Sequence, residues 1–215
     1  MIEGCCNLLD GLLPLCDLAT SNDVLSLELE KLFVYALSWA VGGLLEADDR
    51  VKFTQQIVSL SAGVTATPPL SDSKDTIFEF KINPDSMDWD RWEAPIWEYP
   101  TNLEDPDFSK MLVPTLDSTR ASYVLMQLHK RKKGAMMTGS SGTAKTSTAQ
   151  MFFDSLPNDT MRVKKITFSA ATTPGILQST LEAELDKRGG KSFGPPGGKK
   201  MTIFMDDLSM PEKNG

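Results

Sequence analysis

Apolar side chains recur at helical spacing over residues 1–65. The first group is Leu8, Leu9, Leu12 and Leu13, and it ends at Pro14. A longer second helix is predicted with Asp23 as its cap, running towards Trp39. Because this helix is apolar on most of its faces, we expect other helices to pack around it. A more polar helix is expected through Phe53, Ile57 and Leu60. The pattern predicts a small all-helical unit over residues 1–65.

Residues 66–107 differ in composition from the helical part before them and contain scattered prolines and serines. Residues 76–82 alternate apolar and polar side chains, which predicts a strand with one face exposed to water. Three tryptophans, Trp89, Trp92 and Trp97, then lie close to prolines. Aromatic residues in such a setting more often anchor an irregular segment to a neighbouring surface than bind a ligand. We therefore expect an irregular linker that contains one strand.

Strands and helices are predicted to alternate over residues 108–215. The expected elements are a helix capped by Asp117 or Ser118, a strand at 135–138, a helix that stops before Pro157, a strand at 163–169, a helix with Thr173 as N-cap and Pro174 at its first position, a loop at 189–200, and a buried strand ending at Asp206. Such alternation implies right-handed crossovers and a parallel sheet. The predicted fold class is α/β, with a partial parallel sheet flanked by helices after the all-helical unit. With three strands at most, the chain looks like a fragment whose last strand has an unpaired edge prone to aggregation.

Charge and composition narrow the classes of function. The 215 residues carry a net charge of −7 with a pI near 4.8, which argues against nucleic acid as the main partner. Three crowded cysteines, Cys5, Cys6 and Cys16, are interpreted as reduced, buried thiols of an intracellular protein. The single histidine, His129, argues against a zinc site or a histidine-dependent triad. The longest apolar run, 32–45, is too short to cross a bilayer, so no membrane partner is expected.

One stretch carries the strongest chemical signal. It reads Gly139-Ser140-Ser141-Gly142-Thr143-Ala144-Lys145-Thr146 and follows the apolar run 135–137. A strand that enters a glycine-bearing loop, closes with Lys-Thr and continues as a helix is how proteins cradle the phosphates of ATP or GTP. Lys145 would reach the β- and γ-phosphates, and the Thr146 hydroxyl would ligate Mg²⁺. The stretch on its own also fits a plain Gly/Ser turn before an amphipathic helix.

Ala144 departs from the general pattern of this loop, in which a glycine precedes the lysine. If the backbone at this position needs a positive φ, alanine costs about 1 kcal/mol there. We expect this cost to weaken a phosphate site without abolishing it.

A second stretch supports nucleotide binding. Residues 201–207 form an apolar strand that ends in Asp206 and Asp207, which is typical of the second element of P-loop ATPases. The carboxyl ends of parallel strands open at the ligand crevice, so Asp206 is predicted to hold Mg²⁺ through water. The separation from Lys145 to Asp206 is 206 − 145 = 61 residues, which leaves room for a helix, a strand and a second helix.

Six ordered segments carry a resemblance to a known family. They are Val113 to Arg120 (VPTLDSTR), Gly139 to Thr146, Phe168 to Pro174 (FSAATTP), Asp186 to Arg188 (DKR), Phe193 to Lys200 (FGPPGGKK) and Phe204 to Pro211 (FMDDLSMP). Together they resemble the third AAA+ module of an axonemal dynein heavy chain, and the form Gly-Thr-Ala-Lys-Thr resembles the outer-arm type. The N-terminal helical part is similar to the small helical lid of the second module. The resemblance covers almost the whole chain.

The resemblance implies a role for each motif residue. Val113 and Pro114 would lie near the adenine, Lys145 on the phosphates, and Thr146 and Asp206 on Mg²⁺. Asp207 would take the place where many AAA+ proteins have a glutamate that positions the attacking water. Because aspartate is one methylene shorter, and a displacement of about 1 Å can cost roughly 10²-fold, we expect slow turnover at best.

The resemblance also implies a setting for the chain. It would be a regulatory ATP- or ADP-binding slice of a minus-end-directed microtubule motor in the axoneme of cilia and flagella. Its partners would be other AAA+ modules of the same heavy chain and, through the parent protein, microtubules and intermediate and light chains. Two alternatives remain open: a structural ring module with permanently bound or no nucleotide, and an AAA+ ATPase outside the dyneins.

Overall fold

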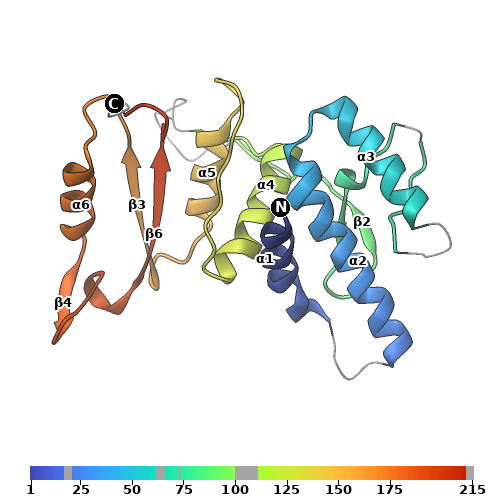
Figure 1. Ribbon diagram of the computed structural model, residues 1–215, viewed down its shortest axis with the longest axis horizontal. Helices are drawn as coiled ribbons and strands as arrows, with labels where there is room; N and C mark the ends of the chain where they lie inside the picture. Colours follow the sequence, from blue (N-terminus) through green and yellow to red (C-terminus); the bar gives the residue numbers. More distant parts are fainter. Residues whose placement is uncertain (17–20, 62–65, 73, 100–110, 212–215) are drawn as a thin grey trace. The chain divides into compact units, whose positions relative to one another are not determined.

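The computed structural model describes residues 1–16, 21–61, 66–72, 74–99 and 111–211. The predicted boundaries at 65/66 and 107/108 involve residues outside these ranges. The chain divides into two compact units, residues 1–139 and 140–215. Each unit is described by itself (Figure 1).

The first unit is mainly helical. Its elements are α1 (Ile2–Leu12), η1 (Leu13–Leu15), α2 (Asn22–Val41), η2 (Gly42–Leu44), α3 (Ala47–Leu60), η3 (Ile77–Glu79), β1 (Phe80–Ile82), β2 (Trp89–Arg91) and α4 (Leu116–Lys130). The three helices predicted before residue 65 are confirmed. Helix α2 begins at Asn22 after Ser21, so Asp23 lies in its first turn and is not its cap. Among the described residues, no helix combines the length and apolarity needed to cross a membrane.

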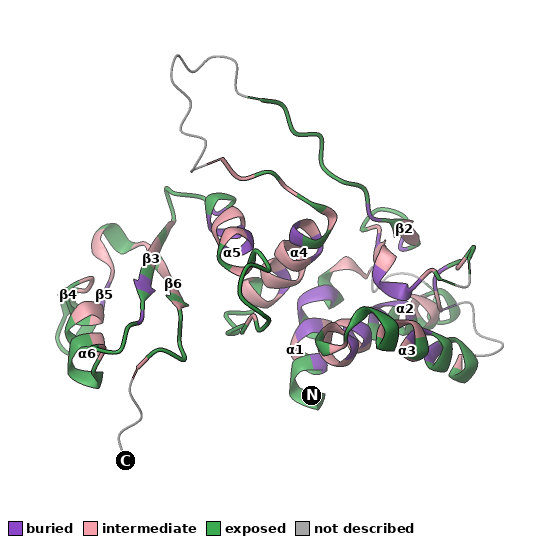
Figure 2. Cartoon of the chain, turned by 90° about the horizontal axis from the view of Figure 1, so that it is seen from above, coloured by how far each residue is buried: buried purple, intermediate pink, exposed green. Residues whose placement is uncertain are grey.

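The core of the first unit lies between helices and a small hairpin. Helix α1 contributes Cys5, Leu8 and Leu12, and α2 contributes Leu32, Tyr35 and Ala36. Strands β1 and β2 pair in antiparallel fashion, with Ile82 opposite Trp89, and bring Ile82 and Met87 into the same core. Figure 2 shows the buried side of α1 and α2 in purple. The hairpin therefore completes a core that the helices do not fill alone.

Two side chains depart from the predicted helix burial. Cys5 lies on the inner face of α1, but Cys6 is exposed and Cys16 is half-buried, so the prediction of three buried thiols is wrong for two of them. Adjacent helical residues point about 100° apart, which explains why Cys6 leaves the face that Cys5 shares with Leu8. Helix α2 also keeps Phe33 48% exposed, so the expectation that neighbours cover most of its faces is wrong there.

The predicted strand at 76–82 is wrong in its first half. Ile77–Glu79 forms a 3-10 turn, and only Phe80–Ile82 is a strand. Ile77 and Phe78 are both buried. Neighbouring side chains of a strand point to opposite faces, so a strand could not bury both against one core.

Two of the three tryptophans anchor their segment as predicted, whereas Trp97 is 38% exposed. Trp92 is buried, and the Trp89 indole N–H donates to the Ala66 carbonyl at 3.0 Å. Sequence reasoning missed the short strand β2, which contains Trp89.

Helix α4 begins with a capping box. The Thr115 side chain accepts from the Ser118 N–H at 3.2 Å, and the Ser118 hydroxyl accepts from the Thr115 N–H at 2.8 Å. The cap is thus Thr115 rather than Asp117 or Ser118, because its hydroxyl satisfies a free N–H of the first turn. At its other end α4 packs closely on α1, where a Cβ at Gly11 would lie 2.7 Å from the Gln127 carbonyl oxygen.

The second unit is an α/β unit. Its elements are α5 (Lys145–Asp154), β3 (Met161–Thr167), α6 (Pro174–Glu182), β4 (Asp186–Gly189), β5 (Ser192–Gly194), η5 (Pro196–Gly198) and β6 (Lys200–Asp206). Strands β3 and β6 are parallel, in register from Met161 opposite Lys200 to Thr167 opposite Asp206. The parallel pairing is confirmed, and so is the start of α6 with Thr173 as N-cap.

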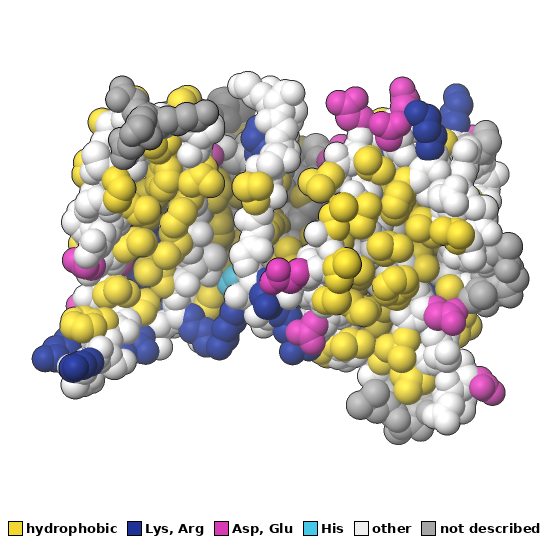
Figure 3. Space-filling view, in the orientation of Figure 1, with side chains coloured by type: hydrophobic (Ala, Val, Ile, Leu, Met, Phe, Trp, Pro, Cys, Tyr) yellow, Lys and Arg dark blue, Asp and Glu magenta, His cyan; other side chains and the backbone are white. Residues whose placement is uncertain are grey.

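Three other expectations for this part of the chain are wrong. Residues 135–138 form no strand, because a strand needs a hydrogen-bonded partner and β3 and β6 pair only with each other among the described residues. The predicted loop at 189–200 contains the β4–β5 hairpin. Strand β6 is not buried, since Ile203 and Met205 are 36% and 39% exposed. Figure 3 shows hydrophobic side chains gathered at the surface over α6, β3 and β6.

Candidate nucleotide site

The loop before α5 has the backbone of a phosphate cradle. Gly142 has φ 78°, and Ala144 has φ 58° and ψ 22°, so two close positions lie in the left-handed region. The Thr143 hydroxyl donates to the Ser140 carbonyl at 2.8 Å and closes the turn. Successive N–H groups in such a conformation form an anion-binding concavity.

Helix α5 presents an N-terminus without a side-chain cap. Ala144 is the N-cap residue and its methyl group offers no acceptor to the first N–H groups of the helix. These groups carry the positive end of the helix dipole. A phosphate is the kind of ligand that satisfies them.

Lys145 is the first residue of α5. Its ammonium donates to the Ser140 carbonyl at 2.7 Å and lies 3.4 Å from the Thr143 hydroxyl oxygen. The side chain therefore folds back over the loop whose N–H groups form the concavity. An ammonium in this position adds a positive charge to the anion site.

Thr146 and Asp206 meet from two different elements. The Thr146 hydroxyl, in the first turn of α5, lies 3.2 Å from each carboxylate oxygen of Asp206 at the end of β6. A hydroxyl and a carboxylate are the hard oxygen donors that Mg²⁺ prefers. The two residues are 60 positions apart in sequence, so this contact joins the start of α5 to the end of β6.

Lys165 is a residue of this site that sequence reasoning missed. Its ammonium lies 3.8 Å from an Asp206 oxygen and over the ring of Phe204. Lys165 pairs in register with Phe204, and Thr167 pairs with Asp206. Alternation along β3 could have placed Lys165 on the face of Thr167, but only the register shows that Asp206 shares that face.

Asp207 lies just outside the strand. It is exposed, has φ 55°, and its backbone N–H donates to an Asp206 oxygen at 3.2 Å. Aspartate tolerates the left-handed region better than most residues. The chain therefore turns away from the ladder immediately after Asp206.

Val113 and Pro114 belong to the first unit. They directly precede Thr115, the cap of α4, and Val113 is 52% exposed. The second unit thus contains residues 140–146 of the predicted loop, with Thr146 in contact with Asp206 and Asp207 next in sequence, while Val113, Pro114 and Gly139 belong to the first unit.

An ion cluster holds α6 to the sheet behind the site. The Glu184 carboxylate, two residues beyond α6, lies 2.6 Å from both the Lys164 ammonium and the Arg162 guanidinium. The hydrogen bond from Lys164 and the charge of Arg162 lower the pKa of Glu184. Because side chains alternate along β3, these two cations share one face and Lys165 lies on the other.

A hollow of about 540 Å³ lies at the other end of this sheet. Its lining includes Asn158, Met161 and Lys199, at or near the beginnings of β3 and β6. The residues with phosphate- and metal-binding chemistry lie at the carboxyl ends of the strands, where parallel sheets carry their ligand sites. The hollow and the candidate nucleotide site are therefore separate.

A left-handed glycine loop, an uncapped helix N-terminus with Lys-Thr, and an aspartate at the end of a neighbouring parallel strand define a P-loop nucleotide-binding module. Residues 100–215 match the family model described as the P-loop containing dynein motor region. Residues 1–94 match the model of the dynein heavy chain AAA lid domain. The chain therefore belongs to the dynein heavy chain family, and its P-loop implies nucleotide binding.

Curated relatives agree with the family models. Over 187 residues the chain is 42% identical to "Dynein gamma chain, flagellar outer arm" of Chlamydomonas reinhardtii, which covers 86% of this chain. It is 36% identical to "Dynein axonemal heavy chain 5" of Rattus norvegicus over 210 residues and to "Dynein axonemal heavy chain 8" of Homo sapiens over 211 residues, with 97% of this chain covered in each case. The matches span only 4%, 6% and 5% of these three relatives. An AAA+ ATPase outside the dyneins is therefore no longer a competing interpretation.

Proposed function

We propose that this chain is an AAA+ segment of an axonemal dynein heavy chain that binds ADP or ATP with Mg²⁺. The observation that carries the proposal is the approach of the Thr146 hydroxyl to both oxygens of Asp206, each at 3.2 Å. Two oxygen-donor side chains from the start of α5 and the end of β6 converge beside a helix N-terminus suited to phosphate.

Each motif residue has a role in the proposed site. Lys145 and the N–H groups of the loop and of α5 hold the β- and γ-phosphates. The Thr146 hydroxyl and the Asp206 carboxylate hold Mg²⁺, which when bound supplies positive charge against the phosphate oxygens. Val113 and Pro114 supply apolar contact to the adenine.

Asp207 is proposed as the residue that positions the attacking water, with slow turnover. Its side chain is one methylene shorter than the glutamate of many AAA+ proteins. A water displaced by about 1 Å reacts roughly 10²-fold more slowly, so we expect nucleotide occupancy rather than rapid hydrolysis to be the main activity.

The proposed setting is a ciliary or flagellar axoneme. The relatives' names include a flagellar outer-arm dynein and axonemal heavy chains. We infer that the parent protein is a minus-end-directed microtubule motor in which this segment regulates microtubule release. Its direct partners would be other AAA+ modules of the same heavy chain. Microtubules and intermediate and light chains would be reached through the parent protein.

The test is equilibrium binding of fluorescent ADP and of Mg·ATP to the chain. Lys145→Ala is expected to abolish saturable binding, because it removes the ammonium beside the loop. Lys191→Ala is the matched control, since it removes one exposed lysine charge from the β4–β5 turn. It should leave binding unchanged.

Three results would change the proposal. Binding that Lys145→Ala leaves intact would place the nucleotide elsewhere. No binding by a chain whose circular dichroism shows it folded would rule out a nucleotide site in these residues. Tight ADP retention without turnover would favour the alternative of a structural ring module.

A further inference from the structure

Lys165 brings a positive charge to the metal side of the candidate nucleotide site. Its ammonium lies 3.8 Å from Oδ2 of Asp206. The Asp206 side chain is only 19% exposed, whereas the Lys165 side chain is 45% exposed. The carboxylate is thus largely withdrawn from water, while the ammonium remains in contact with it. A carboxylate in such a place is stabilised by an opposite charge close by.

Neighbours on one face of the sheet hold Lys165 in this position. In the parallel register Lys165 pairs with Phe204, and Asp206 is two residues further along β6, so all three lie on one face. The Lys165 ammonium lies over the Phe204 ring, 5.6 Å from its centroid. That ring packs against the ring of Phe153 of α5, with centroids 5.3 Å apart. Lys165 is therefore kept beside Asp206 by attraction to an anchored ring as well as to the carboxylate.

The two carboxylate oxygens of Asp206 have different surroundings. Oδ1 accepts from the Asp207 backbone N–H at 3.2 Å, and Oδ2 faces the Lys165 ammonium. The Thr146 hydroxyl lies 3.2 Å from each of them. A metal ion held by Thr146 and Asp206 would therefore meet a carboxylate that a positive charge already neutralises. Because like charges repel at short separation, the ammonium and the metal ion compete for this carboxylate.

We propose that Lys165 is the internal counter-ion of Asp206 that Mg²⁺ displaces, so that Lys165 sets how strongly nucleotide binding depends on the Mg²⁺ concentration. The proposal rests on the proposed function, since it concerns the metal side of that site. Without the metal ion, the ammonium offsets the negative charge that Asp206 would otherwise present to the phosphates. With the metal ion, the ammonium opposes a second positive charge. Its half-exposed, flexible side chain is free to turn towards water at that point.

The experiment measures binding of fluorescent ADP to the chain in EDTA and over a range of Mg²⁺ concentrations. Lys165→Met removes the charge and keeps a long side chain that can pack on Phe204. It is expected to weaken ADP binding in EDTA about threefold, and to lower about three- to tenfold the Mg²⁺ concentration at which half of the effect of Mg²⁺ is reached. These two effects have opposite signs, which a general loss of structure would not produce.

Lys200→Met is the matched control. Lys200 is an exposed residue of β6 that pairs in register with Met161, at the opposite end of the strand from Asp206. This variant removes one positive charge from the same sheet and should leave both measurements unchanged. Lys165→Arg keeps a positive charge beside Asp206 and should restore both values towards those of the unmodified chain. If Lys165→Met does not fold, Lys165→Gln provides the same comparison.

The outcomes separate this inference from the proposed function. Opposite changes in Lys165→Met that are absent from Lys200→Met support the proposal. Equal losses of ADP binding with and without Mg²⁺ would overturn it, because they would place the ammonium on the phosphates. No change in a folded Lys165→Met variant, or the same changes in Lys200→Met, would overturn this inference alone. If the unmodified chain binds no ADP at any Mg²⁺ concentration, the proposed function fails and this inference fails with it.

Discussion

Ala144 is the residue at which the P-loop backbone is under most strain. Its φ of 58° lies in the left-handed region, where a Cβ crowds the following carbonyl. The sequence pattern expects glycine here, and the structure shows that the position does require a positive φ. The alanine is thus tolerated at a cost in stability.

The first prediction concerns this cost. Ala144→Gly should raise the free energy of unfolding of the second unit by about 1 kcal/mol, because glycine adopts a positive φ without a clash. Gly142→Ala is the opposite control: φ is 78° and a Cβ would meet nothing within 4 Å, so only backbone strain remains. It should lower the free energy by a similar amount. Urea unfolding followed by circular dichroism measures both, and a destabilised Ala144→Gly variant would contradict the interpretation.

The second prediction concerns Asp207. Asp207→Glu should raise the rate of ATP hydrolysis by up to about 10²-fold, because the added methylene extends the carboxylate towards the place of an attacking water. Nucleotide affinity should stay unchanged. Single-turnover phosphate release measures the rate, and Asp207→Asn is the control without a base. If Asp207→Glu and Asp207→Asn turn over equally slowly, side-chain length is not what limits hydrolysis.

Helices α1 and α4 approach each other so closely that only glycine fits at the contact. A Cβ at Gly11 would lie 2.7 Å from the carbonyl oxygen of Gln127, which is closer than real Cβ contacts come. Gly4, on the same helix, has its nearest neighbour at 3.9 Å, the Cβ of Ala40. Close packing of α1 on α4 therefore requires glycine at position 11, whereas the space around Gly4 would accept a methyl group.

The third prediction uses this difference. Gly11→Ala should destabilise the first unit by about 1–3 kcal/mol, since α4 must move to admit the methyl group. Gly4→Ala should instead stabilise it by about 0.5–1 kcal/mol, because alanine loses less backbone entropy in a helix. Thermal unfolding of both variants measures the two effects. Changes of the same sign would show that α1 and α4 are not packed as described.

At the scale of the whole molecule, each unit contains a carboxylate that makes its stability depend on pH. In the first unit, hydrogen bonds from Arg91 and then Ser71 lower the pKa of Asp75 to about 2. In the second unit, Lys164 and Arg162 lower the pKa of Glu184. A pKa that is lower in the folded chain means that the unfolded chain binds protons more readily.

The fourth prediction follows from the sign of these shifts. The stabilisation from Asp75 is fully present above its ordinary pKa of about 3.9 and is lost as the pH falls towards 2. The contribution of Glu184 is likewise lost on acidification, at pH values below its ordinary pKa of about 4.3. Thermal midpoints between pH 6 and about pH 2.5 test this. Asp75→Asn should make the thermal midpoint of the first unit depend less on pH, and Glu184→Gln should do the same for the second unit. If either variant keeps the pH dependence of the unmodified chain, the assignment for that residue is contradicted.

Local features of this protein could be predicted from its residues alone. The three N-terminal helices follow from apolar spacing, and the start of α6 from Thr173 and Pro174. The Lys-Thr loop and the strand ending at Asp206 are contiguous signals, so nearly all the candidate site could be named before its geometry was known. Each depends on neighbours within a few residues, and such interactions can be read along the chain.

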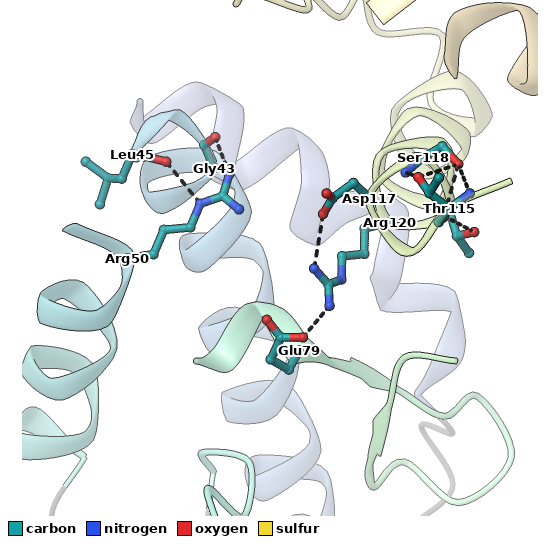
Figure 4. Close-up of polar contacts among 9 residues, drawn as sticks. Gly43, Leu45, Arg50, Glu79, Thr115, Asp117, Ser118 and Arg120 are labelled. Carbon is teal, nitrogen blue, oxygen red and sulfur yellow. Dashed lines mark hydrogen bonds and ion pairs between the residues drawn. The ribbon is translucent and has the colours of Figure 1, made fainter. Parts of the chain in front are cut away.

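Features that depend on partners far apart in sequence became visible only in the folded chain. The β1–β2 and β4–β5 hairpins and the failure of 135–138 to form a strand depend on pairing, which no local pattern specifies. Lys165 joins the candidate site only through the register of β3 with β6. The ion pair between the buried Arg120 of α4 and Glu79 of η3, shown in Figure 4, links residues 41 positions apart. Burial of a charge and register of a strand are properties of two segments together, so only the folded chain could show them.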